Sequence, residues 1–224
     1  MSNRASESAS ESEAKPRSPR PEADQATKRQ MIDAAVACIL DRGFYRASSN
    51  EIARRAGVTW GVIQYHFGTR EALMLAVLED GASRFAELVE TAQIEGDTAV
   101  ERLEQLLDIL VAHYGTPEYL AYMQILLNMD HDPSTSTQVR ETLRSLAEHS
   151  SNNVRRLLRD ALGPGRANGD LATTMFLALR GFAVSQQLLD TMAYDTVATK
   201  TDRAKGQRRL LTQILGSYLE QSSS

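Results

Sequence analysis

Residues 48–67 read SSNEIARRAGVTWGVIQYHF, and this stretch predicts two short helices joined by a tight turn. Ser48 and Glu51 have the spacing of a capping box, in which each side chain bonds a free backbone amide at the start of a helix. Gly57 ends that first helix, because glycine adopts the left-handed backbone that such a turn requires. Thr59 can cap the second helix, which we expect to be equally short.

Two short helices in this arrangement form a helix-turn-helix, whose second helix enters the major groove of DNA. Ile52 and Ala53 of the first helix and Ile63 of the second are expected to pack inward. The other side chains of the second helix would then face DNA: Trp60, Val62, Gln64, Tyr65 and His66. Taken alone, Tyr65 and His66 would more often pack the end of a short helix, but their place in this motif favours DNA contact.

The chain around this motif resembles the TetR family of transcriptional regulators. The matching positions follow in order and without gaps: Gly43-Phe44, the cap at 48–51, Ile52-Ala53, Ala56-Gly57-Val58, Tyr65-His66-Phe67 and Arg70-Glu71-Ala72-Leu73. The resemblance implies an all-α fold. It has an N-terminal three-helix DNA-binding domain and a six-helix C-terminal domain that binds a ligand and dimerises.

The resemblance also implies roles for individual residues, by contact with phosphates or by approach to bases. The predicted DNA-contacting set is Ser49, Asn50, Thr59, Trp60, Gly61, Gln64, Tyr65, His66 and Arg70. Arg70 stands where the family more usually has Lys, and Gln64 stands where it most often has Tyr. Because a Gln amide can pair with adenine through two hydrogen bonds, this change leaves the operator sequence open.

The composition agrees with a DNA-binding module on an acidic body. Of the 224 residues, 24% are charged and 42% are hydrophobic, and the net charge is −4. Residues 15–70 nevertheless hold ten basic against five acidic side chains, whereas residues 71–224 are acidic overall. Such a local excess indicates a polyanionic partner for that module, although an excess of this size can also arise by chance.

Several other classes of protein are disfavoured. No apolar run approaches the roughly 20 residues of a membrane span, and the start MSNRASESASESEAK lacks the apolar core of a secretory signal. Cys38 alone cannot form an internal disulfide, so we expect a cytoplasmic protein. The motifs GxSxG, HExxH, GxGxxG and the P-loop do not occur, which predicts no enzyme and no cofactor. His131 lies between two aspartates that more often cap helices than bind a metal.

We divide the chain into three parts. Residues 1–24 are rich in Ser, Glu and Pro and are expected to form a disordered tail. The basic residues of this segment could instead make an arm that touches DNA. Residues 25–73 are expected to form the DNA-binding domain, and residues 74–224 the C-terminal domain.

Helix signals recur along the chain, and no strand alternation appears. Capping pairs or a Pro at the first helical position predict further helix starts at Thr27 with Gln30, Thr98 with Glu101, Thr116-Pro117 and Asp132-Pro133. Gly163-Pro164-Gly165 predicts a break. We therefore expect three short helices followed by six that are mostly longer.

The last two helices carry apolar stripes that predict a dimer interface. The residues are Leu171, Met175, Ala178, Leu179, Phe182, Leu211, Ile214, Leu215 and Tyr218. Paired from two subunits, these helices would form a four-helix bundle, which brings together the two reading heads that a two-fold DNA site needs. The alternative is that both stripes fill the core of one subunit.

The middle helices mix apolar residues with polar tips, as small-molecule sites do. The predicted ligand-binding residues are His113, Tyr119, Tyr122, Met123, Leu126 and Leu127. The same residues would equally well fill a helical core.

These observations predict a ligand-responsive repressor that binds a palindromic operator as a homodimer. Its expected partners are double-stranded DNA, a second copy of the chain and a small hydrophobic ligand, without a membrane. An activator, or a nucleoid or interaction module without a ligand, remains the alternative.

Overall fold

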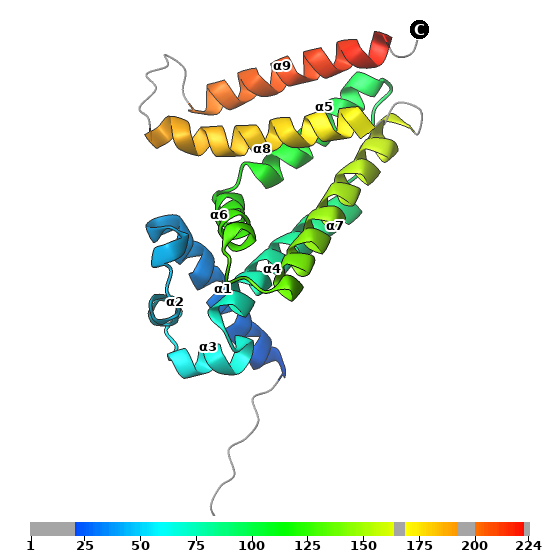
Figure 1. The fold of residues 1–224 in the computed structure, drawn as a ribbon. Helices are drawn as coiled ribbons and strands as arrows, with labels where there is room; N and C mark the ends of the chain where they lie inside the picture. Colours follow the sequence, from blue (N-terminus) through cyan, green and yellow to red (C-terminus); the bar gives the residue numbers. More distant parts are fainter. Residues whose placement is uncertain (1–20, 164–168, 192–199, 222–224) are drawn as a thin grey trace, which may run out of the picture.

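The protein is described by a computed structural model over residues 21–163, 169–191 and 200–221 (Figure 1). Nine α-helices and one 3-10 turn, with no strand, make up this described part, which confirms the predicted all-α fold. The elements are α1 (Pro21–Arg42), η1 (Phe44–Arg46), α2 (Ser49–Arg55), α3 (Trp60–Phe67), α4 (Arg70–Thr91), α5 (Ala99–Tyr114), α6 (Pro117–His131), α7 (Thr137–Leu162), α8 (Gly169–Thr191) and α9 (Lys200–Gln221).

Most of the predicted helix starts are confirmed. Thr98 and Glu101 form a reciprocal capping box at α5, and Thr116 caps α6 with Pro117 in its first turn. The Ser48 hydroxyl accepts from the Glu51 amide at 3.3 Å, but the Glu51 carboxylate is used elsewhere, so this box is one-sided. Thr59 stands at the N-cap of α3 without a side-chain hydrogen bond.

Helix α1 begins earlier than predicted. It starts at Pro21, so residues 21–24 are helical instead of belonging to a tail, and the expected start at Thr27 with Gln30 is wrong. The Thr27 hydroxyl donates to the Ala23 carbonyl at 2.8 Å, a bond within the helix. Acidic residues in the first turn favour this earlier start, because they face the positive end of the helix dipole.

The predicted helix start at Asp132-Pro133 is also wrong. Asp132 follows the end of α6, and its carboxylate accepts from the Ser134 amide at 2.9 Å and from the Ser134 hydroxyl. These bonds hold a turn instead of opening a helix, and they lower the pKa of Asp132. Helix α7 begins only after Ser136, whose hydroxyl accepts from the Val139 amide.

Two apolar cores are built around α4. The first half of α4 joins α1, α2 and α3 in one core, to which α6 and α7 also contribute through Ala121, Ile125, Met129, Val139 and Leu143. The second half packs in a separate core with α5, α7, α8 and α9. Met74, Val77 and Leu78 belong to the first core, so its contacts extend beyond the boundary predicted at residue 73.

The two cores lie at opposite ends of the molecule. Helices α2 and α3 form one end, and α8 and α9 form the other (Figure 1). Helix α8 packs on α5 and α7, while α9 packs on α5. Helix α6 contacts both α1 and α8, so it connects the two ends.

Candidate nucleic-acid interface

The turn between α2 and α3 has the geometry that the sequence predicted. Gly57 has a φ of +67°, in the left-handed region, and the next residue bonds back to α2 through Val58 N and the Ala53 carbonyl at 3.0 Å. Ile52 and Ile63 are fully buried between the two helices. The burial of the inner face of α3 therefore fixes the direction in which its outer face points.

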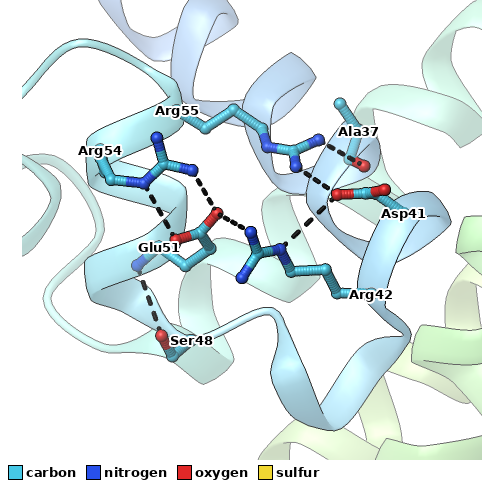
Figure 2. Close-up of polar contacts among 7 residues, drawn as sticks. All are labelled: Ala37, Asp41, Arg42, Ser48, Glu51, Arg54 and Arg55. Carbon is cyan, nitrogen blue, oxygen red and sulfur yellow. Dashed lines mark hydrogen bonds and ion pairs between the residues drawn. The ribbon is translucent and has the colours of Figure 1, made fainter.

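A polar network joins α2 to the end of α1 (Figure 2). The Glu51 carboxylate accepts from Arg54 at 2.7 Å and lies 3.3 Å from the Arg42 guanidinium. Arg55 donates to the Asp41 carboxylate at 2.6 Å and to the Ala37 carbonyl at 3.0 Å. Arg54 and Arg55 are thus both paired with carboxylates within this network.

The charges of this network keep both carboxylates ionised. The hydrogen bond from Arg55 lowers the pKa of Asp41, and the hydrogen bond from Arg54 lowers the pKa of Glu51. The Asp41 side chain is exposed and Glu51 is half-buried, and both pairs reach solvent, so they orient α2 more than they stabilise it.

The outer face of α3 presents polar and aromatic groups to solvent. Gly61 and Gln64 are exposed, and Tyr65 is 76% exposed. Trp60, predicted to be exposed, is instead half-buried against the N-terminal core, as is Val62. The indole packs inward because α3 is short and its first residue lies over the core.

His66 is not on this open face. Its side chain is only 7% exposed, and its Nδ1 lies 3.4 Å from the Asp24 carboxylate of α1. The expectation that its side chain projects outward is wrong, because α1 extends back to cover it. A phosphate contact by His66 remains a prediction.

Arg70 is largely turned toward the protein. Its Nε donates to the Ala47 carbonyl at 3.0 Å, its guanidinium also donates to the Phe44 carbonyl, and the same group lies 4.4 Å from the centre of the Phe44 ring. Burial lowers the pKa of Arg70. It therefore holds η1 against the start of α4, and a phosphate contact by Arg70 also stays a prediction.

The sequence reasoning missed two residues beside this surface. Tyr45 of η1 is 78% exposed, and Arg46 is exposed next to it. They come directly before α2, where Ser49 is half-exposed and Asn50 is exposed. The sequence did offer a signal for DNA contact here, since an aromatic residue and a basic residue stand side by side shortly before the Ser48 cap.

The predicted ligand-binding residues converge on a pocket between α4, α5, α6, α7 and α8. Five of the six line it: His113, Tyr119, Tyr122, Met123 and Leu126. Leu127 is outside the pocket and 53% exposed. The pocket contains about 70 Å³ of water-accessible space and opens to solvent. Whether it holds a ligand remains a prediction.

The pocket wall is aromatic and polar at the same time. The His113 ring stacks on Phe85 with 4.2 Å between centroids, and burial lowers the pKa of His113 to about 4, an effect that the charge of Arg84 increases. His113 is therefore neutral near pH 7. The Tyr122 hydroxyl accepts from Arg84 at 2.8 Å, and its ring lies against Gly81.

The predicted dimer residues separate into two groups. Leu171, Met175, Leu179 and Leu215 are buried within their own subunit, as the alternative reading held, because α8 and α9 each have an inner apolar face. Ile214 is 58% exposed and Tyr218 is 40% exposed, while Ala178 and Leu211 are half-buried. The side chain of Phe182 lies outside the described residues. Leu177 and Leu210, absent from the predicted interface, are also exposed.

Among the described helices and turns, no group of three His, Cys, Asp or Glu side chains is arranged to hold a metal ion. None of the helices described is long and apolar enough to cross a membrane. Cys38 is buried, and burial raises the pKa of its thiol.

The bundle of α1, α2 and α3, with its left-handed turn and open α3 face, has the arrangement of a helix-turn-helix, a fold that reads DNA in other proteins. Residues 31–77 match the family model described as bacterial regulatory proteins, tetR family. This segment of the chain is therefore similar to the DNA-binding part of TetR-family transcriptional regulators.

Two relatives are similar to this chain over most of their own length. The fatty acid metabolism regulator protein of Bacillus subtilis is 24% identical over 182 residues, which are 75% of this chain and 87% of that protein. The regulator UidR of Escherichia coli K12 is 25% identical over 195 residues, which are 85% of this chain and 94% of that protein. The similarity thus extends beyond the helix-turn-helix.

Solved structures share the fold. A TetR-family regulator from Rhodococcus is 18% identical with a TM-score of 0.64, covering 87% of this chain and 99% of that one. FadR from Bacillus subtilis, solved with stearoyl-CoA, is 19% identical with a TM-score of 0.58, covering 88% of this chain and 97% of that one. At these identities the likeness concerns the arrangement of the helices.

Proposed function

We propose that this chain is a ligand-responsive repressor that binds a palindromic DNA site as a homodimer. The observation that carries the proposal is the outer face of α3, where Gly61, Gln64 and Tyr65 are exposed on a helix whose opposite face is fixed in the core. A rigid, short helix with exposed polar tips suits the major groove.

In this proposal Gln64 reads a base edge, and Tyr65 bonds a phosphate. Ser49 and Asn50 at the start of α2, and Thr59 before α3, add contacts to the backbone of the duplex. The exposed Tyr45 and Arg46 extend the same surface.

Dimerisation is proposed through the outer faces of α8 and α9. Leu177, Leu210 and Ile214 are large apolar side chains that remain exposed in one subunit, and Tyr218 lies one turn from Ile214. Covering this outer stripe with the same stripe of a second copy would remove apolar area from water and form a four-helix bundle. Two α3 helices would then read two half-sites.

The ligand response is proposed to start at the pocket. Tyr122 lines it and bonds Arg84, and the Asp80 carboxylate pairs with both Arg84 of the same helix and Arg29 of α1. Helix α6 has a second connection to the DNA-binding domain, because the Gln124 side chain accepts a hydrogen bond from the Phe44 amide at 3.2 Å. A ligand that moves Tyr122 would therefore disturb contacts to α1 and η1, and by linkage DNA and ligand would weaken each other equally.

Similar proteins give this response some support. FadR of Bacillus subtilis was solved with stearoyl-CoA, and the multidrug binding protein EbrR was solved with imidazole. Small-molecule binding in the C-terminal domain is proposed for this chain on the strength of its own pocket.

The experiment that tests DNA reading is selection of random duplexes by the purified chain, followed by binding measurements on the enriched site. Gln64→Ala should lose about 1–3 kcal/mol of binding free energy and relax preference at one base pair per half-site. Tyr65→Ala should weaken binding to all sequences alike.

The matched control is Gln138→Ala, which removes an exposed Gln from α7. It should bind like the wild type. If Gln64→Ala and Gln138→Ala have the same affinity and the same sequence preference, Gln64 does not read DNA.

A further inference from the structure

Two buried polar atoms of the pocket, the Tyr119 hydroxyl and Arg180 Nε, have no hydrogen-bond partner among the described residues. Tyr119 is only 6% exposed, and its hydroxyl lines the pocket without a hydrogen bond in the described structure. Burial raises the pKa of Tyr119, and the nearby charge of Arg180 opposes this rise. A buried hydroxyl without a partner costs free energy, so a ligand that bonds it is favoured.

Arg180 of α8 supplies a cation to the same pocket. Its guanidinium lies 4.0 Å from the centre of the Phe176 ring, and its Nε is buried without a hydrogen bond among the described residues. The ring contact orients the guanidinium without occupying the Nε donor.

No Asp or Glu is among the described residues that line the pocket, so the described lining holds no negative charge next to Arg180. Arg84, the other nearby cation, is paired with Asp80 at 2.5 Å, and His113 is neutral near pH 7. The polar end of the pocket therefore favours a negative charge.

The rest of the wall is apolar. Leu78 and Phe85 of α4, Met123 and Leu126 of α6, and Leu146 of α7 all line the same space. This wall suits a hydrocarbon or aryl body, while the small free volume disfavours a large ligand.

We propose that the pocket binds a carboxylic acid with an apolar body. One carboxylate oxygen accepts from the Arg180 guanidinium and the other from the Tyr119 hydroxyl, because hydrogen bonds to a charged acceptor are stronger than those to a neutral one. The apolar body lies against the leucines and Phe85. This inference rests on the proposed ligand response and names the class of ligand.

The test uses the full chain and three probes of one shape: octanoate, octanamide and octylamine. Isothermal titration should show saturable binding of octanoate, binding of octanamide at least tenfold weaker, and no binding of octylamine. Arg180→Gln should weaken octanoate at least tenfold and abolish its advantage over octanamide. Tyr119→Phe should weaken octanoate by a smaller factor.

Arg144→Gln is the matched control, because it removes an exposed arginine from α7. It should bind octanoate like the wild type, and circular dichroism should show every variant folded. If Arg180→Gln does not fold, the comparison of octanoate with octanamide in the wild type and in Tyr119→Phe carries the test.

The proposal is overturned if octanamide binds the wild type as well as octanoate, if octanoate does not bind at millimolar concentration, or if folded Arg180→Gln binds octanoate like Arg144→Gln. DNA affinity measured without octanoate, octanamide or octylamine tests separately whether the chain binds DNA, as the proposed function requires. If octanoate binds through Arg180 but leaves DNA affinity unchanged, the ligand class stands and the ligand response fails.

Discussion

His113 shows how a single buried side chain makes the stability of the C-terminal domain depend on pH. Its folded pKa is about 4, against 6.5 in an unfolded chain, because its ring is buried against Phe85. Between these values the unfolded chain binds a proton that the folded chain does not. The free energy of unfolding should therefore fall as the pH falls from about 6.5 to about 4, and level off below.

Urea unfolding at a series of pH values checks this prediction. His113→Phe should flatten the pH dependence in that window, where one proton is worth at most about 1.4 kcal/mol per pH unit. His149→Phe, which replaces an exposed histidine of α7, should keep the wild-type slope. Equal slopes for the two variants would show that His113 is not the group responsible.

Gly81 is the second position where one residue decides local packing. A Cβ atom there would lie 2.7 Å from Cε2 of the Tyr122 ring, so Gly81→Ala must displace that ring. The displacement also strains the bond between Tyr122 and Arg84. We expect Gly81→Ala to destabilise the protein by about 1–3 kcal/mol, measured by chemical denaturation.

Gly206→Ala in α9 is the control for this change, because no atom of the described residues lies within 4 Å of its new Cβ. It should be neutral or stabilise by about 0.5–1 kcal/mol, as Ala is the better helix former. A neutral Gly81→Ala would mean that Tyr122 does not pack closely on α4.

At the scale of elements, the first turn of α1 completes the DNA-binding domain. Asp24 covers His66 of α3 from a turn that composition alone assigned to a tail. A chain starting at residue 27 should melt at a lower temperature than a chain starting at residue 21, because it lacks this contact and the first helical turn. Thermal unfolding followed by circular dichroism measures the difference.

Asp24→Asn in the full chain separates the two causes. It keeps the turn and removes the charge next to His66, so its effect should be smaller than that of the truncation. If the chains starting at 21 and 27 melt together, the first turn of α1 contributes nothing to the domain.

Local signals predicted the elements well where they used the backbone directly. The cap at Thr98, the Pro at 117 and the glycine turn at 57 act within a few residues, and all three are found. The Asp132-Pro133 signal failed because the aspartate bonds the Ser134 amide, a competing local choice.

The candidate site was less predictable because its contacts are distant in the chain. The burial of His66 depends on Asp24, and the inward position of Arg70 depends on the carbonyls of Phe44 and Ala47. Helical periodicity finds an apolar stripe on α8 and α9 but cannot tell an inner face from an outer one. The division between buried Met175 and exposed Ile214 therefore needed the structure.

At the scale of the whole molecule, the outer stripe of α8 and α9 should control the oligomeric state. Ile214→Glu places a charge at the exposed centre of the stripe without touching the buried core, so it should favour a monomer. The monomer should still fold and show a thermal unfolding transition. Analytical ultracentrifugation measures the mass. DNA affinity should fall in parallel, because one subunit reads only a half-site.

Gln213→Glu introduces the same charge at the neighbouring exposed position. It should remain a dimer or lose much less association than Ile214→Glu. A wild-type chain that sediments as a monomer at micromolar concentration would contradict the proposed interface.

The most direct measurement of DNA reading by paired α3 helices is hydroxyl-radical footprinting on the duplex that the chain enriches. Two protected segments should appear, related by a two-fold axis, with their centres about 34–36 Å apart along the duplex. A single unpaired footprint, or no protection at low salt, would contradict a dimer that presents two copies of α3 to the major groove.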